Sequence, residues 1–136
     1  MTSTAPEPRS ASVLIVDRSG DTRDVLRTIL ETRGVNILEA KQADEGLELL
    51  REQHPRVVVL DLEVDEVDSA SLQDAFEDES RRSETSLVVL GRVKGANRSD
   101  DSGNSHEPRH IIEKPYHYGP LIRTIEQLLR QHEAAA

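Results

Sequence analysis

The sequence contains no cysteine and no tryptophan, and its aromatic residues are one Phe and two Tyr. Without cysteine the chain forms no disulfide and offers neither a thiol nucleophile nor a thiolate metal ligand. No apolar stretch approaches the roughly 20 residues that a membrane-spanning helix needs. The N-terminus also lacks the apolar region of a signal peptide. We therefore expect a cytoplasmic protein with no membrane partner.

Acidic residues are in excess, with a formal net charge of −9, and the excess is local. Nine acids and no basic residue lie between Asp61 and Glu79, and the 17 remaining acids equal the Lys and Arg in number. Such a run indicates a solvated face, a cation site or a surface for a basic partner. It argues against direct binding of nucleic acid, which needs clustered Lys and Arg.

Two short apolar runs each end in an aspartate. The run SVLIVD ends at Asp17, and the run RVVVLD ends at Asp61. Unbroken β-branched and leucine residues are typical of strands buried on both faces, as in a parallel sheet. Ligands of open α/β sheets bind beyond the carboxyl ends of the strands. Both aspartates are therefore candidate functional residues, and the alternative for Asp61 is a solvated aspartate that starts a loop.

The length of 136 residues fits one domain with one core. Residues 1–10, with two prolines and small polar side chains, predict a disordered arm. We expect a single domain over residues 11–131 and a frayed tail over residues 132–136. Apolar runs predict strands at 12–17, 35–40, 56–61, 87–90 and 110–113. Helical periodicity predicts a helix between Ser19 and Gly34 and further helices at 43–53, 69–79 and 119–130.

This alternation of strands and helices predicts a doubly wound parallel sheet of five strands with helices on both faces. Residues 91–109 interrupt it, because they are rich in Gly, Ser, Asn and charge and hold almost no apolar residue. We expect a polar loop there, which is unusually long for a compact domain. It is not a phosphate-binding loop, since no Gly-Lys-Ser/Thr sequence follows its glycines.

Three motifs in order now support a family comparison. They are VLIVD ending at Asp17, VVVLD ending at Asp61, and IIEKPY with its Lys114-Pro115 pair. In these motifs and their spacing the chain resembles a response-regulator receiver domain, the phosphorylatable module of bacterial two-component signalling. The resemblance covers about residues 12–130. It implies the CheY-like, flavodoxin-like fold, with five parallel strands in the order 2-1-3-4-5.

The resemblance also implies roles for individual residues. Asp61 aligns with the phosphoacceptor, Asp17 with the first of an acidic pair that holds magnesium, and Lys114 with the lysine that contacts the phosphoryl group. Pro115 aligns with a proline that usually follows a cis bond. Phosphoryl transfer to a carboxylate depends on positioning and charge neutralisation, which explains the set. The implied partners are a histidine kinase or phosphotransfer protein and a downstream protein.

The chain departs from the family pattern at several positions. Arg18 replaces the second acid of the magnesium-binding pair, so a usual metal ligand has become a cation. Gly91 stands where the family has a threonine or serine, and Ile111 where it has an aromatic switch residue. The Met-Pro…Gly motif after the phosphoacceptor is absent. The polar loop replaces or shortens the fourth helix.

Arg18 raises two alternatives for the site. A guanidinium about 4 Å from a carboxylate is worth on the order of 4 kcal/mol at an effective dielectric near 20, before desolvation. We therefore expect Arg18 to bridge Asp17 and Asp61 in place of the metal; alternatively it turns to solvent and pairs with Asp21 or Glu63. If magnesium binds, the candidate ligands are Asp17, Asp61 and, more weakly, Glu63. Glu63 lies where the family tunes the lifetime of the phosphoryl group.

Two functional hypotheses follow from these matches and departures. The first is a stand-alone atypical receiver that accepts a phosphoryl group on Asp61 and signals through protein contacts. The second is a pseudo-receiver, a binding module independent of phosphorylation in which Arg18 replaces the metal. A small flavodoxin-like enzyme or cofactor binder is disfavoured by the missing phosphate loop, and we expect no enzyme. The expected switch and partner face holds Gly91, Ile111, Pro115, Tyr116 and Tyr118; the sequence carries no signal for an oligomeric state.

Overall fold

A computed structural model of the chain describes residues 12–64, 69–91, 109–114 and 116–135. Five parallel strands form one sheet in the order β2-β1-β3-β4-β5. The strands are β1 (Ser12–Val16), β2 (Asn36–Ala40), β3 (Val57–Asp61), β4 (Ser86–Leu90) and β5 (Arg109–Ile112). The described helices are α1 (Gly20–Glu31), α2 (Ala43–Gln53), α3 (Ser69–Ser83) and α4 (Tyr118–Ala135). The predicted fold class and strand order are therefore confirmed.

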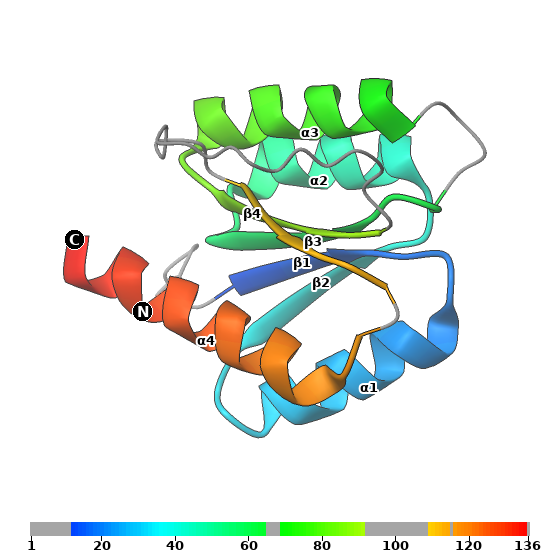
Figure 1. Cartoon of the computed structure of the whole chain (residues 1–136). Coiled ribbons are helices and arrows are strands. Elements are labelled where there is room, and N and C mark those ends of the chain that lie inside the picture. Colours follow the sequence, from blue (N-terminus) through cyan, green and yellow to red (C-terminus); the bar gives the residue numbers. More distant parts are fainter. Residues whose placement is uncertain (1–11, 65–68, 92–108, 115, 136) are drawn as a thin grey trace, which may run out of the picture.

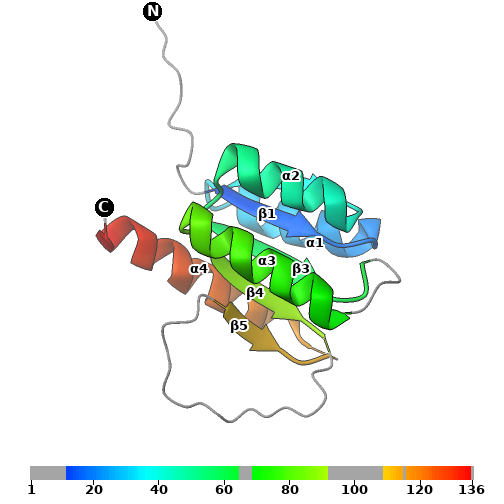
Figure 2. The same ribbon diagram turned by 90° about the horizontal axis from the view of Figure 1, so that it is seen from above.

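Helices cover both faces of the sheet. Figure 1 shows α1 and α4 on one face and α2 and α3 on the other, and Figure 2 shows α2 and α3 lying over the strands from above. Alternate residues of the central strands supply two apolar layers. Val13, Ile15 and Val57 belong to the layer under α1 and α4, whereas Leu14 and Val58 belong to the layer under α2 and α3. This two-sided burial explains the unbroken apolar runs in the sequence.

Two helices extend further than we predicted. The helix expected to end at Glu79 runs to Ser83, and Glu84, with a φ of 56°, ends it in the left-handed region. The last helix begins at Tyr118 and continues to Ala135, so residues 132–135 are helical rather than the frayed tail we expected. Its final turns contain alanine and no glycine or proline, which favours a helix.

Two apolar residues of the helices lie outside both apolar layers. Val25 of α1 and Ala75 of α3 are exposed. The arm expected at residues 1–10 lies outside the described residues, as do residues 92–108 of the polar loop expected at 91–109. Arg109, which we placed in that loop, begins β5. Among the helices that the structure describes, none is both long and apolar enough to cross a bilayer.

Candidate functional site

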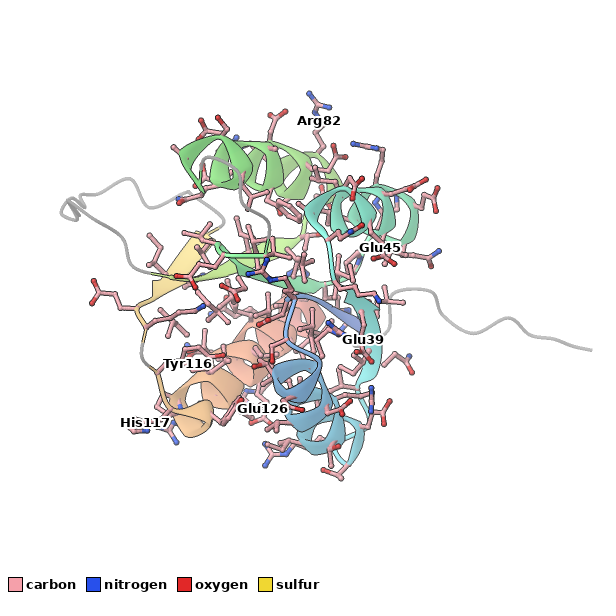
Figure 3. All side chains as sticks on the ribbon, turned by 90° about the vertical axis from the view of Figure 1, so that its right-hand side faces the viewer. Glu39, Glu45, Arg82, Tyr116, His117 and Glu126 are labelled. Carbon is pink, nitrogen blue, oxygen red and sulfur yellow. The ribbon has the colours of Figure 1, made fainter. Side chains whose placement is uncertain are left out.

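The site lies where three strands end on one edge of the sheet. Asp17 directly follows β1, Asp61 is the last residue of β3, and Lys114 lies two residues beyond β5. Because β1 and β3 are neighbours, the two aspartates meet at this edge. Both are nearly buried, with 4% of Asp17 and 7% of Asp61 exposed. Figure 3 shows the molecule from the side that this edge faces.

Lys114 makes the direct contact with Asp61. Its Nζ donates to Asp61 Oδ1 at 2.8 Å and to Glu63 Oε1 at 3.4 Å. Burial acts to lower the pKa of Lys114, but the hydrogen bond and charge of Asp61, with a smaller contribution from Glu63, outweigh it and raise the pKa. The Glu63 side chain is 67% exposed, so its contact is screened by solvent and contributes little. The structure thus brings together Asp17, Asp61 and Lys114, as we predicted.

Asp17 lies in an environment that disfavours its charge. Burial raises its pKa above the ordinary value, and the charge of Asp61 and a hydrogen bond with that carboxyl group raise it further. The Ser19 amide, which donates to Asp17 Oδ1 at 2.9 Å, and the charge of Lys114 act in the opposite direction. Two adjacent buried acids favour a bound cation, because a cation lowers the free energy of the state in which both are ionised.

Arg18 does not form the bridge that we expected. Its side chain is exposed, and it makes no salt bridge with Asp17 or with Asp61. The reason is local: the Asp17 side chain turns inward to accept the Ser19 amide, and Arg18, the next residue in this turn, points to solvent. Arg18 instead lines an open pocket of about 210 Å³, which Asp17, Ser19, Asp61 and Glu63 also line.

The residues at the site fit a water-rich magnesium ion. Among the described residues, no group of three or more His, Asp or Glu side chains is arranged to hold a metal. Magnesium does not need such a group, since it commonly binds one or two carboxylates and keeps several waters. Asp17 and Asp61 supply two carboxylates beside an open pocket. Glu63, the weaker of the expected ligands, contacts Lys114 instead.

Gly91 directly follows β4, at the same edge of the sheet as the site, and is buried. A Cβ atom at this position would lie 2.9 Å from Leu62 Cδ1 and 3.1 Å from Leu62 Cβ, which is closer than van der Waals contact allows. Leu62 follows Asp61 and belongs to the apolar layer under α2 and α3. A hydrocarbon side chain therefore occupies the space that a serine or threonine at position 91 would need.

The remaining residues of the expected partner face lie around β5 and the start of α4. Ile111 is 40% exposed, and Tyr118 is 36% exposed. Tyr116 packs against the layer under α1 and α4, and its ring meets that of Tyr118 edge to face, with centroids 5.8 Å apart. Pro115 lies outside the described residues.

Our sequence reasoning missed Arg23 and Glu39. Arg23 Nη1 donates to the main-chain oxygen of Asp17 at 2.6 Å, and Arg23 Nε donates to Glu39 Oε1 at 3.0 Å. Figure 3 shows Glu39 on β2, close to α1. The one signal in the sequence was an acid near the end of the predicted strand at 35–40, directly after the apolar pair Ile37 and Leu38, and this signal does not identify a partner.

A doubly wound sheet with two buried aspartates and a lysine at its carboxyl edge is the arrangement that our sequence comparison implied. The chain belongs to the response-regulator receiver domain family, whose model matches residues 13–126. It is therefore a domain of two-component signalling. This family assignment confirms the resemblance found in the three motifs.

Individual curated proteins are also similar to this chain. Protein PilH of Pseudomonas aeruginosa is 27% identical over 121 residues, covering 88% of this chain and 98% of PilH. An uncharacterized 14.6 kDa protein of Leptolyngbya boryana is 40% identical over 60 residues, covering 44% of this chain and 46% of that protein. The chain spans about half the length of the first curated relatives that it matches.

Solved structures support the fold. The signal receiver domain of a LuxO repressor protein from Vibrio parahaemolyticus superimposes with a TM-score of 0.70 at 16% identity, covering 92% of this chain and 94% of that one. A CheY-like receiver domain protein from Methanospirillum hungatei gives a TM-score of 0.69 at 20% identity, covering 92% and 98%. At these identities the likeness establishes the fold alone.

The contact between Gly91 and Leu62 predicts that a larger residue at position 91 destabilises the fold. We expect Gly91→Ser to lower the free energy of unfolding by about 1–3 kcal/mol, as overpacking does. Adding Leu62→Ala opens space, so the double variant should be less destabilised than the sum of the two single variants. Urea unfolding measures all three. Gly20→Ser is the control, because a Cβ there meets only Arg23 Nη2, at 3.7 Å; strict additivity of the first pair would contradict the contact.

We predict that the Tyr116 hydroxyl ionises at a higher pH than an exposed tyrosine. Burial raises its pKa to about 12, and the charges of Tyr118, Asp17 and Asp61 contribute. With no tryptophan and two tyrosines, ultraviolet absorbance of Tyr118→Phe follows Tyr116 alone. Its midpoint should stay above the ordinary value of 10.0, and adding Asp61→Asn should lower it. A midpoint at the ordinary value, with circular dichroism showing an intact fold, would contradict the burial. The Tyr116 phenol ionises at a lower pH in the unfolded chain than in the folded chain. Its ionisation therefore lowers the free energy of unfolding as the pH rises from about 10 through about 12.

Proposed function

We propose that this chain is a cytoplasmic receiver that accepts a phosphoryl group on Asp61 and signals through protein contacts rather than as an enzyme. One observation carries the proposal: Asp17, Asp61 and Lys114 converge at the carboxyl edge of the sheet beside an open pocket. Protein PilH matches this chain along 98% of its own length, so a domain of this size makes up nearly the whole of that relative. The phosphoryl donor would be a histidine kinase or phosphotransfer protein. A downstream protein would then bind the phosphorylated chain and carry the signal further.

The reaction that we propose uses the Asp61 oxygen that does not contact Lys114. Oδ1 already accepts from the Glu63 amide at 3.0 Å and from Lys114 at 2.8 Å. Oδ2 is therefore the nucleophile that attacks phosphorus; a P–O bond forms while the P–N bond of a phosphohistidine breaks, and the imidazole leaves. Asp17 and Asp61 would hold magnesium, which supplies positive charge beside the phosphoryl oxygens. Lys114 is close enough to hold a further phosphoryl oxygen.

A second function, that of a pseudo-receiver, is favoured by Arg18. This cation lines the pocket where the family has a metal-binding acid, and Gly91 offers no hydroxyl to a phosphoryl oxygen. In this alternative Arg18 turns inward when a partner binds, takes the place of the metal beside Asp17, and the domain acts without phosphorylation. Because Arg18 is exposed in the free chain, its side chain does not block magnesium from Asp17. It is also free to turn inward when a partner binds, so both functions can be tested.

Amide chemical shifts distinguish the two functions. We expect magnesium followed by beryllofluoride or a small phosphodonor to perturb amides around Asp61, and Asp61→Asn to abolish the perturbation. The matched control is Glu63→Gln, which keeps both aspartates and should retain the response. No change at millimolar magnesium would support the pseudo-receiver. Arg18→Asp should then restore metal binding, because it returns a carboxylate to the pocket.

The tyrosine pair is the proposed docking point for a partner protein. Tyr118 is partly exposed, and its edge-to-face contact with Tyr116 orients both rings at the start of α4. Replacing both by alanine should lower the stability, because Tyr116 packs on the core, but leave the chain folded by circular dichroism. It should abolish binding to the cognate kinase or target, measured by calorimetry. Ile111→Ala, on the neighbouring strand β5, tests whether the face extends to the sheet edge. Unchanged affinity of the double tyrosine variant would refute the docking role.

A further inference from the structure

Arg23 connects three elements at the base of the site. It lies on α1, donates through Nη1 to the main-chain oxygen of Asp17, and donates through Nε to Glu39 of β2. The two distances are 2.6 and 3.0 Å. Glu39 pairs in register with Ile15 of β1, so the same guanidinium ties α1 to the strand beside Asp17. The Arg23 side chain is largely buried, with 16% exposed.

The main-chain oxygen of Asp17 needs a donor from outside the sheet. β1 ends at Val16 and β2 ends at Ala40, so the backbone ladder ends here. The Asp17 amide still donates to the Ala40 oxygen at 3.0 Å. The Arg23 guanidinium then supplies a charge-assisted hydrogen bond to the Asp17 oxygen, which is stronger than one between neutral groups.

Asp17 is thus held at three points. Its amide bonds to Ala40, its carbonyl oxygen to Arg23, and its carboxylate Oδ1 to the Ser19 amide. The Ser19 side chain also caps α1 by accepting the Thr22 amide at 3.2 Å. Because the backbone is fixed on both sides of the Cα atom, the carboxylate is directed inward, toward Asp61.

We propose that Arg23 is a positioning residue for the site: it holds the main chain of Asp17 so that the Asp17 carboxylate stays beside Asp61 and can share a divalent cation with it. This inference deepens the proposed function and rests on it for the cation. Arg23 would not touch the cation or a phosphoryl group. It acts through Asp17, as outer-sphere partners of metal ligands do.

Arg27 provides a matched control. Its Nη1 donates to the other Glu39 oxygen, Oε2, at 2.6 Å, and its Nη2 donates to Asp24 at 2.9 Å. Arg27 therefore shares the link from α1 to β2 but makes no hydrogen bond with Asp17. Replacing either arginine by alanine removes a salt bridge to Glu39, and only Arg23→Ala also removes the donor to the Asp17 oxygen.

The test compares Arg23→Ala with Arg27→Ala in two measurements. Amide hydrogen exchange in the metal-free protein reports on two amides: that of Asp17, which bonds to Ala40, and that of Ser19, which bonds to the Asp17 carboxylate. We expect faster exchange of both in Arg23→Ala and no change in Arg27→Ala. Magnesium titration followed by amide shifts should show an affinity loss of about 10–100-fold for Arg23→Ala, the range for lost outer-sphere partners, and no loss for Arg27→Ala.

Two further variants keep the test decisive if Arg23→Ala does not fold. Arg23→Lys retains the charge but lacks the planar fork that reaches two acceptors at once, so it should give intermediate exchange rates. Glu39→Gln keeps an acceptor for Arg23 and should retain the protection of the Ser19 amide. Equal exchange rates in the Arg23 and Arg27 variants would overturn the proposal and leave Arg23 as a link between α1 and β2.

The proposed phosphorylation of Asp61 and the positioning role of Arg23 can be refuted independently. If the unaltered chain binds no magnesium, the proposed metal-assisted phosphorylation is wrong, while exchange at Asp17 and Ser19 still decides whether Arg23 positions Asp17. If the chain binds magnesium and the Arg23 variants bind it equally well, the proposed function stands and the positioning role is refuted.

Discussion

The site depends on two acids kept nearly buried and adjacent at the ends of the two central strands. Removing like charges from water is unfavourable unless cations or hydrogen bonds compensate. Lys114 compensates Asp61 directly, and the Ser19 amide compensates Asp17 in part. The compensation is incomplete, because the pKa of Asp17 remains raised, chiefly through burial. A further cation beside the two carboxyl groups would therefore lower the free energy of the state in which both are ionised.

The fold can maintain this arrangement because rigid elements hold each part. The strand order makes β1 and β3 neighbours, so their ends bring Asp17 and Asp61 together. The two apolar layers fix the sheet against helices on both faces. Sites on rigid elements are more precise than sites on loops. Asp61 ends its strand and Asp17 directly follows its strand, whereas Lys114 lies two residues beyond β5.

The sequence was sufficient for the five-stranded parallel sheet, and the resemblance of its three motifs to the family gave the strand order and placed Asp17, Asp61 and Lys114 at one edge. Unbroken apolar runs identify buried strands, and an acid at the end of such a run is placed at the ligand-binding edge by the fold itself. The sequence did not predict where the Arg18 side chain points, because its orientation depends on how Asp17 turns to accept the Ser19 amide. It was also insufficient for the contacts of Arg23 with Asp17 and of Leu62 with Gly91. Such contacts depend on three-dimensional proximity, which no periodic pattern in the chain records.

The departures from the family pattern bear on how a change at Asp61 would reach the surface. Gly91 has no side chain to move, and Leu62 fills the adjoining space. Lys114, by contrast, already contacts Asp61 and lies two residues before Tyr116, whose ring packs on the core and against Tyr118. If Asp61 accepts a phosphoryl group as proposed, that group would compete with the Asp61 carboxylate for the Lys114 ammonium. The contact between Lys114 and Asp61 would then be the part of the site that responds, and this response needs no hydroxyl at position 91.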